Sequence, residues 1–391
     1  MTAASTRGSE GGVSVEIACV VGARPNFMKM APVFEGLRSY PWLRPTLVHT
    51  GQHYDEAMSR VFFDELGMPA PDVNLEVGSA THAVQTARIL ERFDAWLEEA
   101  RPGLVLVAGD VNSTVACALA AAKRTIPVGH VESGLRSRDR TMPEELNRIV
   151  TDVLADFLFA PSADAVENLA AEGIDRAKIH FVGNSMIDSL RRHLAAARAR
   201  RTHDRFGLDP RGYAVVTLHR PSNVDDPESL ERILDALRSL AARLPVVFPA
   251  HPRTAARLAG PGDPSIAGVT VCEPLGYLDF LGLMEASRLV VTDSGGIQEE
   301  TTALGVPCLT LRDNTERPIT VSEGTNRLIG SDPAAIAPAA GAVLAMPPPA
   351  PRAPALWDGH AGGRIAAILA AALQPRPGLP APEEDSCRAT I

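Results

Sequence analysis

The chain has 391 residues, a hydrophobic content of 45% and a formal net charge of −9, so it is long enough for two domains and too acidic for a nucleic-acid-binding surface. No apolar stretch is long enough to cross a bilayer, the polar N-terminus is unlike a signal peptide, and the five scattered cysteines lack zinc-like spacing. These features predict a soluble, cytoplasmic protein that binds neither nucleic acid nor membrane.

Strand-like apolar runs alternate with helical patterns in the first part of the chain. Short β-branched runs predict strands, and apolar residues spaced by three or four predict helices. In order, we expect a strand at 15–21, a helix at 28–37, a strand at 46–49, helices at 55–66 and 82–100, a strand at 104–108, a helix at 113–123, a strand at 127–131, a helix at 144–154, and strands at 156–160 and 178–182.

A second alternation follows, with helix 187–201, strand 214–218, helix 227–240, strand 246–250, helix 277–286, strand 289–292 and a last helix at 363–373. Repeated β-α-β units indicate parallel sheets covered by helices, here two doubly wound domains with a cleft between them. We place the first domain at 13–183 and the second at 184–356. Residues 1–12 and 374–391 are expected to be disordered.

The stretch after strand 289–292 is the most informative. Ser294, Gly295 and Gly296 remove side-chain bulk where a helix should begin, which exposes backbone N–H groups to an anion. The carboxylates that follow, including Glu300, suit sugar hydroxyls. A plain strand–turn–helix is the alternative, and the adjacent acids favour a phosphate-and-sugar site.

Other polar residues also follow predicted strands, where ligands bind in open α/β sheets. They are Arg24, Asp110, His130, Glu132, His219, Arg220, His251 and Asp293. Each has a structural alternative: Arg24 and nearby Lys29 could be solvated, Asp110 could cap a helix, and Glu144 could only complement a helix dipole.

Several carboxylates without a metal-binding spacing suit proton transfer at carbon or at a glycosidic oxygen. The first strand is not followed by Gly-x-Gly-x-x-Gly, and the chain contains no Gly-x-x-x-x-Gly-Lys-[Ser/Thr]. A nicotinamide cofactor and triphosphate hydrolysis are therefore not expected. The residues indicate a nucleotide-sugar enzyme with acid–base chemistry, without identifying the reaction.

Eight ordered motifs extend this reading, and with them the chain from about 15 to 373 resembles the bacterial non-hydrolysing UDP-N-acetylglucosamine 2-epimerases. The motifs are Gly22-Ala-Arg-Pro-Asn-Phe-Met-Lys29, Thr50-Gly-Gln-His53, Gly109-Asp110, His130-Val-Glu-Ser-Gly-Leu-Arg136, Pro143-Glu-Glu-Leu-Asn-Arg148, Leu218-His-Arg-Pro221, Asp293-Ser-Gly-Gly-Ile-Gln-Glu-Glu300 and Arg312-Asp-Asn-Thr-Glu-Arg-Pro318. The resemblance implies a GT-B fold of two Rossmann-like domains, an interdomain site, a last helix within 360–373 that returns to the first domain, and a homodimer.

The resemblance also implies the reaction and the site. UDP-GlcNAc would become UDP-ManNAc, which usually feeds surface polysaccharide, by elimination and re-addition of UDP through a 2-acetamidoglucal, with no cofactor or metal. The implied catalytic residues are Asp110, Glu132, Glu144, His219 and Lys29. The implied UDP-sugar contacts are Arg24, Arg136, Ser294, Gly295, Gly296, Glu300 and Arg317. A second UDP-GlcNAc would activate the enzyme through Gln52, His53 and His251.

Two motifs depart from the family pattern. Asn26-Phe27-Met28 stands where other members have Glu-Ala-Ile, and Ser222 stands where they have Glu. Neither change removes an implied catalytic group, but both could alter the sugar accepted. The alternatives that remain open are a hydrolysing epimerase, an epimerase of diacetamido uronic-acid sugars, a GT-B glycosyltransferase and a non-catalytic UDP-sugar sensor.

Overall fold

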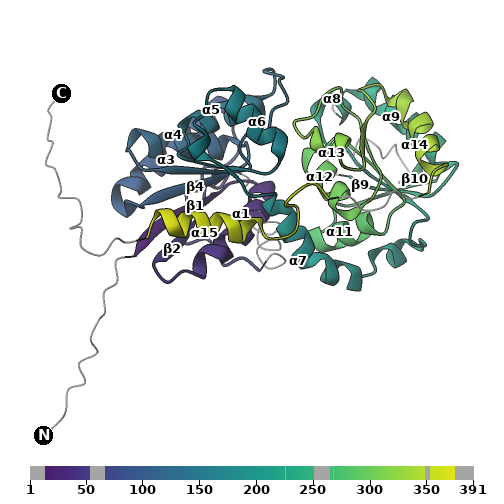
Figure 1. Cartoon of the computed structure of the whole chain (residues 1–391). Helices are drawn as coiled ribbons and strands as arrows, with labels where there is room; N and C mark the ends of the chain where they lie inside the picture. The colour runs from purple at the N-terminus through teal and green to yellow at the C-terminus, as the bar shows by residue number, and fades with distance from the viewer. Residues whose placement is uncertain are drawn as a thin grey trace, which may run out of the picture.

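The computed structural model describes residues 14–52, 67–224, 226–250, 265–266, 268–347 and 353–374. These residues form two lobes, each built on a sheet with helices packed against it (Figure 1). The two sheets, parallel except for one antiparallel pairing at the edge of the second, confirm the predicted α/β class and the GT-B architecture. The helix predicted at 55–66 lies outside the described residues.

The first sheet has seven parallel strands in the order β3-β2-β1-β4-β5-β6-β7. The strands are β1 Val15–Val21, β2 Leu43–His49, β3 Val73–Asn74, β4 Leu104–Ala108, β5 Val128–Val131, β6 Phe157–Ala160 and β7 Ile179–Phe181. Its helices are α1 Arg24–Arg38, α3 His82–Ala100, α4 Asn112–Lys123, α5 Pro143–Leu154 and α6 Ala163–Ala171. All five residues of β4 are buried, as expected for a parallel strand covered on both faces.

The second sheet has the order β10-β11-β9-β8-β12-β13-β14, and only the pairing of β10 with β11 is antiparallel among its described strands. The strands are β8 Ala214–Thr217, β9 Val246–Pro249, β10 Ser265–Ile266, β11 Val269–Cys272, β12 Leu289–Thr292, β13 Cys308–Thr310 and β14 Asn326–Leu328. Its helices are α8 Pro221–Val224, α9 Pro227–Ala241, α11 Tyr277–Glu285, α12 Gly295–Leu304, α13 Ile319–Ser322 and α14 Ile336–Leu344.

Two segments join the lobes. Helix α7 (Ser185–Ala199) follows Gly183, and the chain returns through Trp357 to α15 (Ala361–Ala372), which lies along α1 in Figure 1. Gly183 has φ +83°, and a Cβ there would lie 2.1 Å from the Leu356 carbonyl oxygen. The two segments that join the lobes can therefore touch at this point only because residue 183 is a glycine. The buried Trp357 donates from Nε1 to the Pro161 carbonyl at 2.9 Å.

Some helices begin earlier than the periodicity predicts. Helix α1 starts at Arg24 rather than at residue 28, because Pro25 stands in its first turn, where a missing N–H costs nothing. Helix α12 starts at Gly295, two residues before its first large apolar side chain. Short strands such as β13 and β14 were not predicted, because three residues are too few to show a period.

Candidate active site

Two predicted catalytic residues of the first domain lie at the carboxyl ends of neighbouring strands β4 and β5. Asp110 follows β4 and Glu132 follows β5, and these strands pair in parallel. Glu132 has φ +70°, an uncommon backbone conformation for a non-glycine residue that is consistent with a functional constraint on its side chain. Lys29, on α1, is buried and ion-paired with Glu132.

Gly109 allows this contact. It has φ +66°, and a Cβ at this position would lie 2.8 Å from Lys29 Nζ and 3.3 Å from Glu132 Oε2. Any larger residue would therefore push the cation away from the carboxylate. Asn26 also fixes the start of α1 here, since its amide donates to the Ala108 carbonyl at 2.7 Å and accepts from the Ala23 N–H at 3.0 Å.

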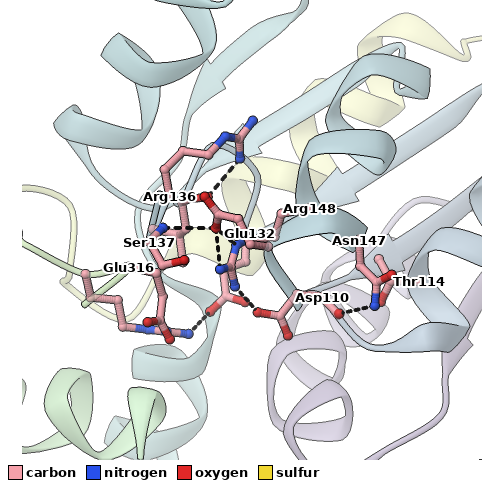
Figure 2. Close-up of polar contacts among 12 residues, drawn as sticks. Asp110, Thr114, Glu132, Arg136, Ser137, Asn147, Arg148 and Glu316 are labelled. Carbon is pink, nitrogen blue, oxygen red and sulfur yellow. Dashed lines mark hydrogen bonds and ion pairs between the residues drawn. The ribbon is translucent and has the colours of Figure 1, made fainter. Parts of the chain in front are cut away.

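The second domain completes a buried charge cluster around Glu132. Arg317 donates to Glu132 Oε1 at 3.2 Å across the domain boundary, and its Nε lies 2.9 Å from Glu299 Oε2. Glu316 is ion-paired with Arg317 and, at 2.7 Å, with Arg312. Figure 2 shows Asp110, Glu132 and Arg148 of the first domain gathered near Glu316 of the second. We call Lys29, Asp110, Glu132, Arg148, Glu299, Glu316 and Arg317 the interdomain charge cluster.

Cations and burial pull on the carboxylates of this cluster in opposite directions. Burial alone would raise the pKa of Asp110, but its ion pair with Arg148, together with Lys29 and Arg317, holds that pKa below its ordinary value. Burial would also raise the pKa of Glu316, but Arg317 and Arg312 outweigh it and hold that pKa well below its usual range. At Glu299 burial dominates and raises the pKa to about 7, although Arg317 opposes it. The site therefore combines an ionised carboxylate with one that titrates near neutral pH.

Asp110 does not cap α4. Another group holds the start of that helix, since Gln52 Oε1 accepts from the Ser113 N–H at 3.2 Å. Asn147 donates to the Asp110 carbonyl at 2.9 Å. The side chain of Asp110 is thereby left to Arg148 and the cleft.

Glu144 and Glu145 have different positions at the start of α5. Glu145 is buried and accepts from the Ser137 N–H at 2.9 Å and from Arg148 at 2.6 Å, so it shapes the preceding loop. Glu144 is half-buried and contributes to the electrostatic environment of Arg220 in the second domain. Glu144 is thus near enough to Arg220 to act on its pKa across the domain boundary.

Asp293 organises the loop after β8. Its carboxylate accepts from the Arg220 N–H at 2.9 Å and from Asn223 at 2.9 Å, and it lies 2.8 Å from His219 Nδ1. Burial would raise the pKa of Asp293, but these hydrogen bonds, led by that of His219, hold it below its ordinary value. The exposed His219 ring is therefore oriented through Nδ1, and Nε2 is the nitrogen that remains for a ligand.

The glycine turn has a role within the protein that the sequence does not reveal. A Cβ at Gly295 would meet Arg317 Nη1 at 2.5 Å and Glu316 Oε1 at 2.6 Å, so Gly295 makes room for that ion pair. A Cβ at Gly296 would contact only Met186, at an ordinary 3.6 Å. Ser294, the N-cap of α12, makes no side-chain capping bond, and Glu300 is buried on the same helix.

Two predicted ligand contacts are engaged elsewhere in the structure. Arg136 donates to both oxygens of Glu172, at 2.8 and 2.7 Å, and pairs with Asp152 at 2.7 Å, so its guanidinium is used within the first domain rather than in the cleft. Gln52 Oε1 accepts from the Ser113 N–H at 3.2 Å and hydroxyl at 2.7 Å, which holds the start of α4. A local motif cannot show these partners, because they lie far away along the chain.

The remaining predicted residues are only partly described. Arg24 is the first residue of α1, and its side chain lies outside the described part of the structure. His53 and His251 lie outside the described residues altogether. Sequence reasoning missed Arg148, Glu299 and Glu316 as site residues, although all three stand inside the motifs quoted above and membership in those motifs was the available signal.

Among the described residues, no group of three or more His, Cys, Asp and Glu side chains is placed to hold a metal ion. No described helix is both long and apolar enough to cross a membrane.

Comparisons with known proteins agree on one family. A family model described as UDP-N-acetylglucosamine 2-epimerase matches residues 35–370. The UDP-N-acetylglucosamine 2-epimerase of Methanococcus maripaludis is 42% identical over 81% of this chain and 88% of its own length. The UDP-2,3-diacetamido-2,3-dideoxy-D-glucuronate 2-epimerase of Pseudomonas aeruginosa is 43% identical over 81% and 89%. The crystal structure of Methanocaldococcus jannaschii UDP-GlcNAc 2-epimerase in complex with UDP-GlcNAc and UDP matches with a TM-score of 0.83 at 38% identity, covering 91% of this chain and 99% of that one.

Proposed function

The chain belongs to the UDP-N-acetylglucosamine 2-epimerase family, and from that premise we propose that it interconverts UDP-GlcNAc and UDP-ManNAc without releasing UDP. The observation that carries the proposal is the interdomain charge cluster, in which Glu132 of the first domain meets Arg317 of the second. Buried carboxylates and cations that meet between the two domains suit proton transfer at carbon beside a departing diphosphate.

The C2 proton of this sugar is not acidified by a neighbouring carbonyl, so the reaction proceeds by elimination. A carboxylate takes the C2 proton, the C1–O bond to UDP breaks with its electron pair going to the diphosphate, and a C1=C2 double bond forms. Re-addition of UDP with protonation on the opposite face of C2 completes the inversion. Two faces require at least two proton-transfer groups, and we assign this work to the three carboxylates Asp110, Glu132 and Glu144.

The cations serve the departing UDP. Lys29 and Arg317 bring positive charge to the cleft, and His219, oriented by Asp293, assists near the phosphate. The start of α12 supplies backbone N–H groups and a favourable dipole for the diphosphate at Ser294 to Gly296. We assign the ribose hydroxyls to Glu300 on the same helix.

Transfer of deuterium to C2 tests the reaction. Incubation with UDP-GlcNAc in heavy water should place deuterium at C2 of both UDP-GlcNAc and UDP-ManNAc, with the nucleotide still attached, as followed by NMR. Net accumulation of free UDP would instead indicate hydrolysis, and transfer to an acceptor would indicate a glycosyltransferase. Because one 43% identical relative acts on a diacetamido uronic-acid sugar, the same assay with that UDP-sugar decides which substrate is preferred. No exchange with either sugar would refute epimerisation.

The glycine turn offers a prediction with its own control. Gly295→Ala should lower UDP affinity about 10-fold or more, because the added methyl displaces Arg317 from Glu316 and weakens charge-assisted contacts. In Gly296→Ala the added methyl group would contact only Met186, at an ordinary distance. Any loss of UDP affinity in that variant would therefore come from contact between the methyl group and the bound diphosphate. Calorimetric UDP titration measures both, and unchanged affinity in both variants would exclude close approach of the diphosphate to this turn.

We further propose that a second UDP-GlcNAc activates the enzyme. A ligand that contacts both domains binds the closed arrangement with more contacts and therefore favours it. Gln52, one of the residues assigned to this ligand, holds Ser113 at the start of α4, just beyond Asp110, so a change in its contacts would reach the site. His53 and His251 are the other residues assigned to this ligand.

Initial rates test the activation. Highly purified UDP-ManNAc should be converted slowly, and trace UDP-GlcNAc should accelerate it. Full activity from the first turnover without UDP-GlcNAc would show that Gln52 and His53 have no regulatory role.

We also propose a homodimer formed through α5. This helix buries polar residues, among them Glu145, Arg148 and Asp152, and exposes Leu146, Val150 and Val153, with Val153 65% exposed. The exposed residues stand four and three positions apart, which places them on one helix face. Helix α5 therefore turns its polar residues toward the protein and an apolar face toward solvent. A second copy of the chain that covers this face best explains the arrangement.

Light scattering with size-exclusion chromatography tests the dimer. Val153→Asp should yield a monomer, because the new carboxylate would be buried at the interface. Val321→Asp, at a 43% exposed residue of the second domain, is the matched control and should not change the mass. A wild-type monomer, or a Val153→Asp dimer, would contradict the proposal.

The unpaired cysteines Cys19, Cys117, Cys272 and Cys308, the four within the described residues, support the proposed location in the reducing cytoplasm.

A further inference from the structure

His130 is fully buried on β5 and contacts two hydrogen-bond acceptors. Its Nδ1 lies 2.6 Å from Asp152 Oδ1, and its Nε2 lies 2.8 Å from the carbonyl oxygen of Gly109. A neutral imidazole carries one N–H and can serve only one of these acceptors. Because a carbonyl can never donate, both contacts are made only if the ring carries two protons or if Asp152 carries one.

The surroundings of Asp152 place the proton on the histidine. Asp152 Oδ2 accepts from the Gly134 N–H at 3.1 Å and from Arg136 at 2.7 Å. Burial would raise the pKa of Asp152, but His130 and Arg136 outweigh that effect and hold it below its ordinary value. Asp152 is therefore an anion that stabilises an imidazolium.

The charges around this ring balance. Asp152 on α5 faces two cations, His130 and Arg136, and Arg136 in turn pairs with Glu172 at the end of α6. Two positive and two negative groups thus form one chain of contacts. A buried cation is tolerated when it is paired and hydrogen-bonded in this way.

The imidazolium acts on the loop that carries Asp110. His130 binds the Gly109 carbonyl, Asn147 binds the Asp110 carbonyl at 2.9 Å, and Arg148 binds the Asp110 carboxylate. Gly109 has φ +66° and stands directly after β4, so the carbonyl held by His130 sets the direction in which the chain enters Asp110.

We propose that His130 is a positioning residue: an imidazolium, paired with Asp152, that holds the Gly109 carbonyl and thereby sets the direction of the Asp110 carboxylate. This role rests on the proposed function for its effect on catalysis, whereas the protonation state of the ring does not. His130 is fully buried, so it acts through the Gly109 carbonyl, and Arg136 and Glu172 extend the ion-pair chain from Asp152.

Nitrogen-15 NMR of histidine-labelled protein tests the protonation state without reference to activity. One of the ten histidines should carry protons on both ring nitrogens at pH 7, and its Nε2–H should show a nuclear Overhauser contact to Gly109. His180, whose pKa is lowered by burial, provides a neutral ring in the same sheet. A single neutral tautomer for His130 at pH 7 would overturn the proposal.

Kinetics test the positioning. His130→Asn and Asp152→Asn should each lower kcat about 10- to 100-fold, the scale of a misdirected catalytic group, with KM and UDP affinity changed less than about 2-fold. Asp152→Asn should also return His130 to a neutral tautomer. His180→Asn is the matched control and should keep wild-type kcat.

The outcomes separate this proposal from the proposed function. Wild-type kcat in a folded His130→Asn variant would overturn the positioning role while leaving epimerisation intact. A loss of UDP affinity equal to the loss in kcat would also overturn it, because it would indicate general damage. If the wild-type protein shows no epimerisation, the NMR result still decides whether the buried imidazolium exists.

Discussion

Glu132→Gln is expected to lower turnover by about 10²-fold or more, the usual scale for a lost general acid or base. Glutamine keeps the shape of the side chain but cannot take up the C2 proton. It also removes the negative charge that holds Lys29 and Arg317 together across the cleft. The measurement is kcat for UDP-GlcNAc conversion, followed by NMR, with UDP affinity as a check that the second domain is intact.

Asp110→Asn and Glu144→Gln are expected to have effects of the same order, because each removes one proposed proton-transfer group. Glu167→Gln, at an exposed position on α6, is the matched control and should leave turnover unchanged. Deuterium exchange at C2 separates the roles, since a variant that lacks one base should still exchange from one epimer faster than from the other. Turnover near that of the wild type in all three variants would remove these carboxylates from the mechanism.

Arg317→Met is expected to be severe in two ways. It leaves Glu132, Glu299 and Glu316 without a shared cation in a buried setting, and breaking a buried ion pair costs about 3–5 kcal/mol of stability. Loss of a donor aimed at developing charge should also lower kcat by about 10²- to 10³-fold. Chemical denaturation measures the first effect and steady-state kinetics the second.

A second substitution tests the electrostatic explanation. Glu299→Gln added to Arg317→Met should recover part of the lost stability but not the activity, because it removes one uncompensated carboxylate and restores no cation. Arg198→Met, which breaks an exposed pair with Glu285, is the control and should cost at most about 1 kcal/mol. If Arg317→Met is no less stable than Arg198→Met, the charge cluster does not hold the domains together.

The alternation of apolar patterns was enough to predict the fold class. Strands β1, β4 and β12 begin and end where the sequence places them, because each is a largely apolar run of the kind found in strands buried on both faces. Helix α6 was missed, although α11, which is equally long, was predicted; strand β13 was missed because three residues are too few to show a period. Chain order combined with the rule for parallel sheets also predicted which residues follow strand ends.

The sequence by itself therefore determined that Asp110 and Glu132 follow the ends of strands in a parallel α/β domain, because that placement depends on local pattern and strand direction. It could not determine which groups they meet. Arg317 lies 185 positions from Glu132, and the contact exists only because the two domains close over each other. The same holds for Arg136, which sequence similarity assigns to the ligand and tertiary packing assigns to Asp152 and Glu172. Charge pairing depends on distance and burial, and only the folded chain specifies both.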